Sequence, residues 1–304
     1  MEFFELFTPD GVALETSTIL TVVALMFMYT FVGICAGFGG GLTTMPLVTL
    51  LLPVKMAAPM SVMVGTATAL YATWLSRKDT DWKSAAVLIG FSVLGVPVGI
   101  YALSYLPDAM MKAFLGTFLI VYSFYSLFIP RLPVYDKGWI AAPMGVIAGA
   151  LGAAFSTNGP PVVIYGMLRN LAPAAFRGTL NAFFTANNLT VIGGLAGAGI
   201  LTISTVKLVI LCIPTMIAGS LVGQWVHKRI PTPIFRKMVF MLLIGSGAML
   251  IKGYLDVPAW TCLVPAFGGV AILQLIFGKK VAAIRAEEDA RQAAIAAAEA
   301  AEAK

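Results

Sequence analysis

Three long apolar stretches constrain this chain more than any other feature. They cover residues 18–36, 85–103 and 112–129, and each is long enough to cross about 30 Å of hydrocarbon as a helix. Charged side chains make up only 11% of the 304 residues, whereas a soluble domain carries about a quarter. We therefore expect an all-α integral membrane protein with a single polytopic domain over residues 1–277.

The charge and cysteine patterns point to the lipid bilayer, and not to nucleic acid, as the partner of this chain. The net charge is +6, but the basic residues lie in loops and in the tail, where cytoplasmic retention of Lys and Arg explains them. Cys35, Cys212 and Cys262 lie in apolar runs without a CxxC spacing, so we expect no disulfide framework and no metal site. We expect no cofactor either, and the sequence leaves the oligomeric state open, a homodimer included.

The chain contains two related halves. Residues 99–108 and 223–232 match in their Gly and Leu/Ile-Pro positions, and GFGGGLTTMP at 37–46 corresponds to ALGAAFSTNGPP at 150–161. Each of the latter two segments breaks an apolar run.

We predict two repeats, each with a broken helical hairpin and three transmembrane helices. Repeat 1 (18–129) has its hairpin at 18–52 and helices near 56–76, 84–104 and 109–129. Repeat 2 (139–252) has its hairpin at 139–169 and helices near 174–198, 205–226 and 234–252. An extra helix at 257–277 and a cytoplasmic Ala/Glu-rich tail at 278–304 would follow.

The loop charges indicate that the two repeats are inverted. Loop 77–83 contains Arg77, Lys78 and Lys83, whereas its counterpart near 199–206 contains no Lys or Arg. In the other pair, loop 227–237 is basic and loop 104–112 has one lysine. Under the positive-inside rule this exchange means inverted topology, with the N-terminus outside and the C-terminus in the cytoplasm. In a rival layout, residues 18–37 span the membrane fully and the N-terminus moves inside.

The two breaks predict a binding site. Unpaired backbone groups cannot face lipid, and paired breaks in inverted repeats are typical of secondary transporters with a site near the midplane. The N-terminus of each half-helix suits an anion, and in the second break Pro160 fits the first helical turn. The alternative is that Gly and Pro only allow close helix packing. We expect the anion to bind the backbone amides and side chains of Gly39, Gly40, Gly41, Thr43, Thr44, Ser156, Thr157, Asn158 and Gly159.

A cation on a polar helical face extends this site. Arg177 lies a few residues into a predicted spanning helix, and Asn181, Thr185 and Asn188 follow on the same face. Such a stripe is costly in hydrocarbon and should face a partner or a cavity. The alternative is an arginine that snorkels to the interface. We add Arg177 and Asn181 to the expected site, because a guanidinium fork matches an oxyanion.

The motifs resemble those of a known family. GxGGG followed by T-x-P in the first half, with an Asn-Gly-Pro-Pro break in the second, is similar to the TauE/SafE family of sulfite exporters, which overlaps the 4-toluene sulfonate uptake permeases. The resemblance covers residues 18–277. It implies a transporter of the bacterial inner membrane for sulfite or an organosulfonate such as sulfoacetate, and we expect export. The second half has Ala153, Ala154 and Phe155 where the first half has glycines, so the pocket size is not fixed by the resemblance.

Three alternative functions make different demands on the sequence. A permease for another small inorganic or carboxylate anion would use the same architecture. A membrane-embedded enzyme needs a base or metal ligands within the bilayer, and the apolar segments contain no Asp, Glu or His, so we expect no enzymatic activity. A structural or sensory membrane protein would not need two broken hairpins. The same scarcity of titratable groups predicts a carrier without a proton relay of its own.

Overall fold

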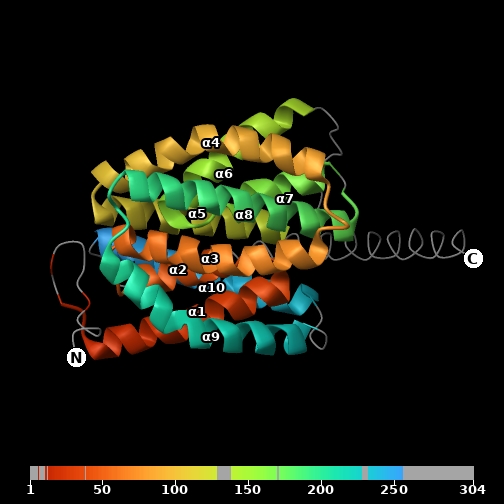
Figure 1. Cartoon of the computed structure of the whole chain (residues 1–304). Coiled ribbons are helices and arrows are strands. Elements are labelled where there is room, and N and C mark those ends of the chain that lie inside the picture. The colour runs from red at the N-terminus through yellow and green to blue at the C-terminus, as the bar shows by residue number, and fades with distance from the viewer. Residues whose placement is uncertain are drawn as a thin grey trace, which may run out of the picture.

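The chain folds into a bundle of helices. The computed structural model describes Leu6, Gly11 and residues 13–37, 39–128, 138–169, 171–227 and 232–255. Within these residues there are ten α-helices, one short 3₁₀ helix and no β-strand (Figure 1). The helices are α1 (Thr16–Ala36), α2 (Gly40–Thr49), α3 (Val54–Ser76), α4 (Trp82–Tyr105), α5 (Asp108–Phe128), η2 (Gly138–Ile140), α6 (Ala141–Phe155), α7 (Gly159–Leu168), α8 (Pro173–Gly197), α9 (Ile203–His227) and α10 (Thr232–Leu255).

The described helices are those of a multi-pass membrane protein. Four of them, α1, α4, α5 and α9, are long and apolar enough to cross a membrane. Large apolar side chains such as Leu94 on α4 and Leu221 on α9 are exposed, as lipid-facing residues are. The helices predicted outside the two hairpins begin and end within about three residues of the predicted positions. The predicted extra helix at 257–277 and the tail at 278–304 lie outside the described residues.

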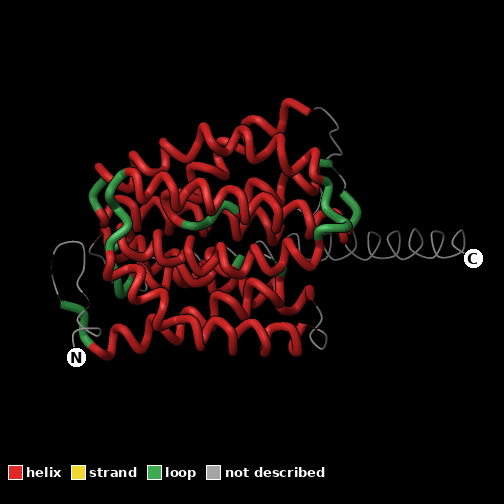
Figure 2. Tube along the Cα trace, viewed as in Figure 1, coloured by secondary structure: helices red, strands yellow, loops and turns green. Residues whose placement is uncertain are grey.

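Each predicted broken hairpin is a pair of helices. α1 packs against α2, and α6 packs against α7. Most connecting loops lie at the two ends of the bundle, whereas the two breaks lie inside it (Figure 2). The chain turns at each break through a left-handed residue, Gly37 with φ 76° and Ser156 with φ 54°. Glycine adopts this conformation at no steric cost, but serine is strained in it.

This register corrects one correspondence made from sequence. Ala153, Ala154 and Phe155 do not take the places of the glycines, because α6 continues through them as regular helix. The helix ends instead place Ser156 where the first half has Gly37, and Gly159 where it has Gly40. The alanines continue the helix because alanine favours it more than any other residue.

Contacts between the halves follow a regular pattern. α1 packs along α9 and α4 along α6, while α3 faces α8 and α5 faces α10. Small residues allow the closest approaches. A Cβ added to Gly116 of α5 would lie 2.6 Å from the carbonyl oxygen of Gly247 on α10, and a Cβ added to Gly247 would lie 2.8 Å from the carbonyl oxygen of Gly116. Such close crossings through small residues are typical of helices in membranes.

The bundle also has aromatic residues at one end. Trp74 near the end of α3, Trp82 at the start of α4, Trp139 before α6 and Trp225 near the end of α9 are all exposed. These helix ends lie together, on the right in Figure 1. Tryptophan is enriched where a membrane meets water, so this end of the bundle has the composition of an interface.

Candidate functional site

The two breaks touch inside the bundle. A Cβ added to Gly41 in the first turn of α2 would overlap the carbonyl oxygen of Ser156 and lie 3.4 Å from its Oγ. Gly40 is equally confined, since its Cβ would overlap the carbonyl oxygen of Tyr29 on α1. Gly41 therefore brings the backbone of the first break against the second break, and Gly40 brings it against α1; a larger residue would prevent either contact.

The breaks present different donors to this junction. α2 begins at Gly40 with no side-chain cap, so the amides of its first turn are without helical partners. α7 begins at Gly159, and Pro160 and Pro161 follow in its first turn and have no N–H groups. Backbone amides thus dominate the first break, whereas the side chains before α7 dominate the second.

A cavity of about 410 Å³ opens at the junction. Nine of the eleven residues predicted for the site line it: Gly39, Gly40, Gly41, Ser156, Thr157, Asn158, Gly159, Arg177 and Asn181. Thr43 and Thr44 do not. Thr43 bonds back through Oγ1 to the carbonyls of Gly39 and Gly40, both at 3.0 Å, and Thr44 is fully buried. These threonines lie about a turn beyond the start of α2 and point into the protein instead of into the gap.

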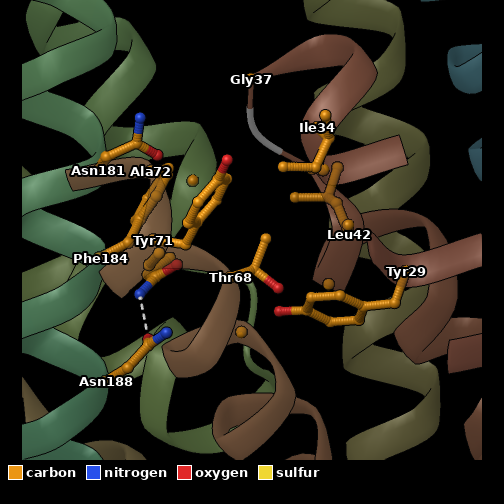
Figure 3. A pocket seen from close by; sticks show the side chains of 18 of the residues that line it. Tyr29, Ile34, Gly37, Leu42, Thr68, Tyr71, Ala72, Asn181, Phe184 and Asn188 are labelled. Atoms are coloured by element: carbon orange, nitrogen blue, oxygen red, sulfur yellow. Dashed lines mark hydrogen bonds between the residues drawn. The ribbon is translucent and has the colours of Figure 1, made fainter. Parts of the chain in front are cut away.

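Side chains from opposite sides of the bundle face one another across the cavity (Figure 3). Asn181, Phe184 and Asn188 of α8 form one wall, and Ile34, Leu42 and Tyr29 lie opposite. Leu75 and Ser76, the last residues of α3, also line it, as does Gln224 near the end of α9. The cavity therefore extends from the breaks to the end of the bundle where α3 ends.

On the other side of the breaks the bundle is closed by apolar packing. Met26 of α1, Met45 of α2 and Met60 of α3 are fully buried in the main hydrophobic core. Ser61 contacts Met45 through a long hydrogen bond of 3.8 Å to its Sδ. Flexible methionine side chains fill irregular space between helices, so they seal the cavity from the opposite end of the bundle.

Arg177 lies at the mouth of the cavity. It is exposed, it lines the cavity, and its Nε lies 3.7 Å from the position of a Cβ on Gly37, at the first break. Asn188 lies eleven residues further along α8, which corresponds to about 16 Å of helix. Arg177 and Asn188 are therefore at different depths.

The deep end of the cavity contains a cluster of uncharged polar groups. Asn158 donates from Nδ2 to Oδ1 of Asn187 at 2.8 Å and to Oδ1 of Asn188 at 3.1 Å. Tyr29 and Ser156 also line the cavity. The Thr157 hydroxyl, in a residue that is 1% exposed, has no hydrogen-bond partner within the described residues. Among the described residues, this end of the cavity offers hydrogen-bond donors and carries no charge.

Sequence reasoning missed several of the lining residues. Asn188 could have been predicted, because it lies on the same helical face as Arg177. The face alone is not sufficient, since Thr185 also lies on it but does not line the cavity and is hydrogen-bonded to Thr73 of α3 at 2.9 Å. Nothing in the sequence marks Tyr29 or Tyr71, because apolar runs contain many aromatic residues. Only the crossing of α1 and α3 at the break brings them to the cavity.

The cavity has the chemistry of a binding site for a small anion. Among the described residues that line it there is no Asp, Glu or His, and one cation, Arg177. Within the described residues there is no group of three His, Cys, Asp or Glu side chains that could hold a metal ion. Hydrogen-bond donors beside an apolar wall fit an anion that also has an organic part.

Comparisons with known proteins agree on a family. The family model described as "Sulfite exporter TauE/SafE" matches residues 22–250, a range that includes every residue lining the cavity. The probable sulfite/organosulfonate exporter TauE of Cupriavidus necator is 26% identical over 245 residues, which cover 77% of this chain and 93% of that protein. The probable inner membrane transporter protein TsaS of Comamonas testosteroni is 24% identical over 180 residues, which cover 59% of this chain and 75% of that protein. No solved structure matches the chain.

Proposed function

Because the chain belongs to the TauE/SafE sulfite exporter family, we propose that it is a secondary transporter that exports sulfite or an organosulfonate such as sulfoacetate across the bacterial inner membrane. The observation that carries this proposal is the cavity at the junction of the two breaks, whose described lining has donors and Arg177 but no acid. Helix N-termini and an arginine attract an anion, and the absence of carboxylates in the lining avoids repulsion.

The proposed topology has two inverted repeats, each a broken hairpin followed by three helices. The helix pairing supports it: α1–α9 and α4–α6 exchange places under a two-fold relation, and α3–α8 and α5–α10 map onto themselves. The end of the bundle with Arg77, Lys78 and Arg169 would be cytoplasmic. The N-terminus would then be periplasmic, the tail cytoplasmic, and the cavity open to the cytoplasm, as an exporter needs in order to load.

The size of the cavity favours an anion with an organic part over bare sulfite. A space of about 410 Å³ lies within the range of small-molecule sites and far exceeds what a four-atom anion fills. The wall formed by Ile34, Leu42 and Phe184 would contact carbon, while the polar groups would face the oxygens. Organosulfonates have both parts.

A ligand screen of the purified protein tests the substrate class. Sulfite, sulfate, sulfoacetate, taurine and acetate are added separately and the unfolding temperature is recorded. A ligand at 100 times its Kd contributes about 2.7 kcal/mol of stability, so sulfoacetate should raise the unfolding temperature more than acetate does. Stabilisation by acetate or sulfate alone would favour a permease for another small anion.

Cysteine accessibility tests the topology. In a cysteine-free background, Lys78→Cys and Ile203→Cys place single thiols at exposed positions after α3 and at the start of α9. Under the inverted arrangement they react with an impermeant maleimide from opposite sides of the membrane. Reaction of both thiols from the same side would refute the inverted arrangement.

A further inference from the structure

We propose that the deep end of the cavity is a charge-neutral subsite for the oxyanion group, in which Thr157 and Asn188 contact the anion and Asn187 positions them without touching it. The inference rests on the proposed function, since it concerns the same cavity. It divides that cavity into a mouth, where Arg177 recruits the anion, and a floor, where the anion is selected.

Thr157 supplies a donor that the described residues leave unused. Thr157 is 1% exposed and lines the cavity, and its buried hydroxyl has no hydrogen-bond partner among the described residues. A buried hydroxyl without a partner is unfavourable. It lies next to the start of α7, where the amide of Gly159 also has no helical partner. A bound oxyanion would satisfy both donors.

Asn188 supplies the second donor. Its Oδ1 accepts a hydrogen bond from Asn158, which leaves its Nδ2 with two protons to donate. Figure 3 shows the oxygen of Asn188 directed at this bond and the nitrogen directed away from it. The nitrogen lies 3.2 Å from the position of a Cβ on Gly65, a glycine that also lines the cavity. The bond to Asn158 therefore turns the amino group of Asn188 toward the cavity.

Asn187 holds this arrangement in place from outside the cavity. It is fully buried and is absent from the lining. Its Oδ1 accepts the shorter of the two hydrogen bonds from Asn158, at 2.8 Å, and its own Nδ2 has no partner within the described residues. Gly152 makes room for it, since a Cβ there would lie 2.7 Å from the Asn187 oxygen. A positioning role explains why Asn187 is buried with an unpaired amide nitrogen. Its oxygen holds Asn158, and Asn158 orients Asn188 and is the neighbour of Thr157 in the chain.

The floor would recognise the anion by hydrogen bonds and not by charge. Arg177 and Asn188 leave α8 eleven residues apart, about 16 Å along the helix, so we place Arg177 at the mouth and Asn188 at the floor. A charged contact at the mouth raises the rate of association and depends on salt. Neutral donors bind more weakly than charged ones, which suits a carrier that must also release its substrate.

The test measures the affinity of the full-length protein for sulfoacetate and for acetate in detergent, at low and high salt. We expect Asn188→Ala and Thr157→Val each to weaken sulfoacetate binding about tenfold, with a smaller loss for acetate, because a sulfonate offers more oxygens. Asn187→Ala should weaken it comparably, although Asn187 does not line the cavity. Thr190→Val, which removes a hydroxyl bonded within α8 and outside the cavity, is the matched control and should bind as the wild type does.

Two further comparisons separate positioning from general damage. Combining Asn187→Ala with Asn188→Ala should lose little more than either alone, since both act through the same donor. Asn187→Ser keeps an uncharged oxygen that can accept from Asn158 and should lose less affinity than Asn187→Ala, with a melting temperature recorded alongside. Arg177→Gln should slow association at low salt and leave the sulfoacetate-to-acetate affinity ratio unchanged.

Additive losses for the two asparagines, wild-type affinity in Asn187→Ala, or loss of selectivity in Arg177→Gln would each overturn the proposal. If the variants lose affinity in the same pattern but the wild type prefers acetate, the subsite is supported and a sulfonate is refuted as the substrate. Binding of none of the tested anions to the wild type would refute both.

Discussion

Replacing Gly41 with alanine tests whether the two breaks pack as closely as the structure indicates. The added Cβ would overlap the carbonyl oxygen of Ser156, well inside the roughly 3.5 Å at which two such atoms attract each other. A flexible side chain could rotate away from the methyl group, but a backbone carbonyl cannot. The two breaks would have to separate, and the cavity between them would change shape.

The expected loss of stability follows from two opposing effects. Alanine in place of glycine inside a helix contributes about 1 kcal/mol, and Gly41 lies in the first turn of α2 without a positive φ. Overpacking a filled site costs about 1–3 kcal/mol, and the upper end applies to a rigid neighbour. The variant should therefore be less stable than the wild type by about 2 kcal/mol.

Gly193→Ala is the matched control. Gly193 lies within α8 and has open space around the position of a Cβ, so the control should gain about 1 kcal/mol. Denaturant unfolding in detergent should then separate the two variants by about 3 kcal/mol, and Gly41→Ala should also lose affinity for sulfoacetate. If the two variants unfold alike and Gly41→Ala binds normally, the breaks are not in contact.

Three shorter predictions follow from local geometry. Ser156 has a left-handed φ of 54°, so Ser156→Gly should melt at a higher temperature than Ser156→Ala, which keeps the strain and loses the hydroxyl; the reverse order would contradict the strain. The side-chain hydrogen bond from Ser84 is the main cause that lowers the pKa of Asp81. The stability from this carboxylate is present above its unfolded pKa of about 3.9 and is lost as the pH falls through the lower folded value, so Asp81→Asn should flatten the acid side of the stability profile; an unchanged profile would rule this out. Asp108 accepts a hydrogen bond from the amide of Val54 at 2.6 Å, and Asp108→Ala should lower stability by about 1–2 kcal/mol in denaturant unfolding, whereas no change would make this contact irrelevant.

The helices and the family could be predicted from the sequence because both depend on local patterns. Apolar runs of about twenty residues determine where helices cross a membrane, and Gly and Pro determine where they break. The resemblance to the TauE/SafE family, based on the two breaks, is confirmed by the family match over residues 22–250. Local patterns also misled: Ala153 and Ala154 look like the counterpart of a glycine-rich break but extend α6.

The way in which the deep end of the cavity is assembled could not be predicted, because its residues come from separate elements. Asn158 precedes α7, Asn187 lies within α8, and Tyr29 lies within α1; only packing brings them together. Thr43 and Thr44 were expected to add to the backbone amides of the first break, but a helix that begins at Gly40 turns both threonines away from the cavity. The amides of a break can be located from the sequence, whereas side-chain directions depend on where the helix begins.

The residues that line the cavity lead to a prediction about the driving force of transport. Proton-driven carriers usually move the proton through an Asp, Glu or His between helices. In the part of the chain that the structure describes, none of these types lines the cavity. An inside-negative potential favours the expulsion of an anion by about 2.3 kcal/mol per charge per 100 mV, so export of a cytoplasmic sulfonate needs no coupled proton. Sulfite is different only because it can carry a proton itself. In proteoliposomes with the potential and the pH gradient set independently, sulfoacetate should follow its own gradient and the potential. Uphill movement of sulfoacetate driven by a pH gradient, with the potential clamped at zero, would show that the protein carries protons and that the reasoning is wrong.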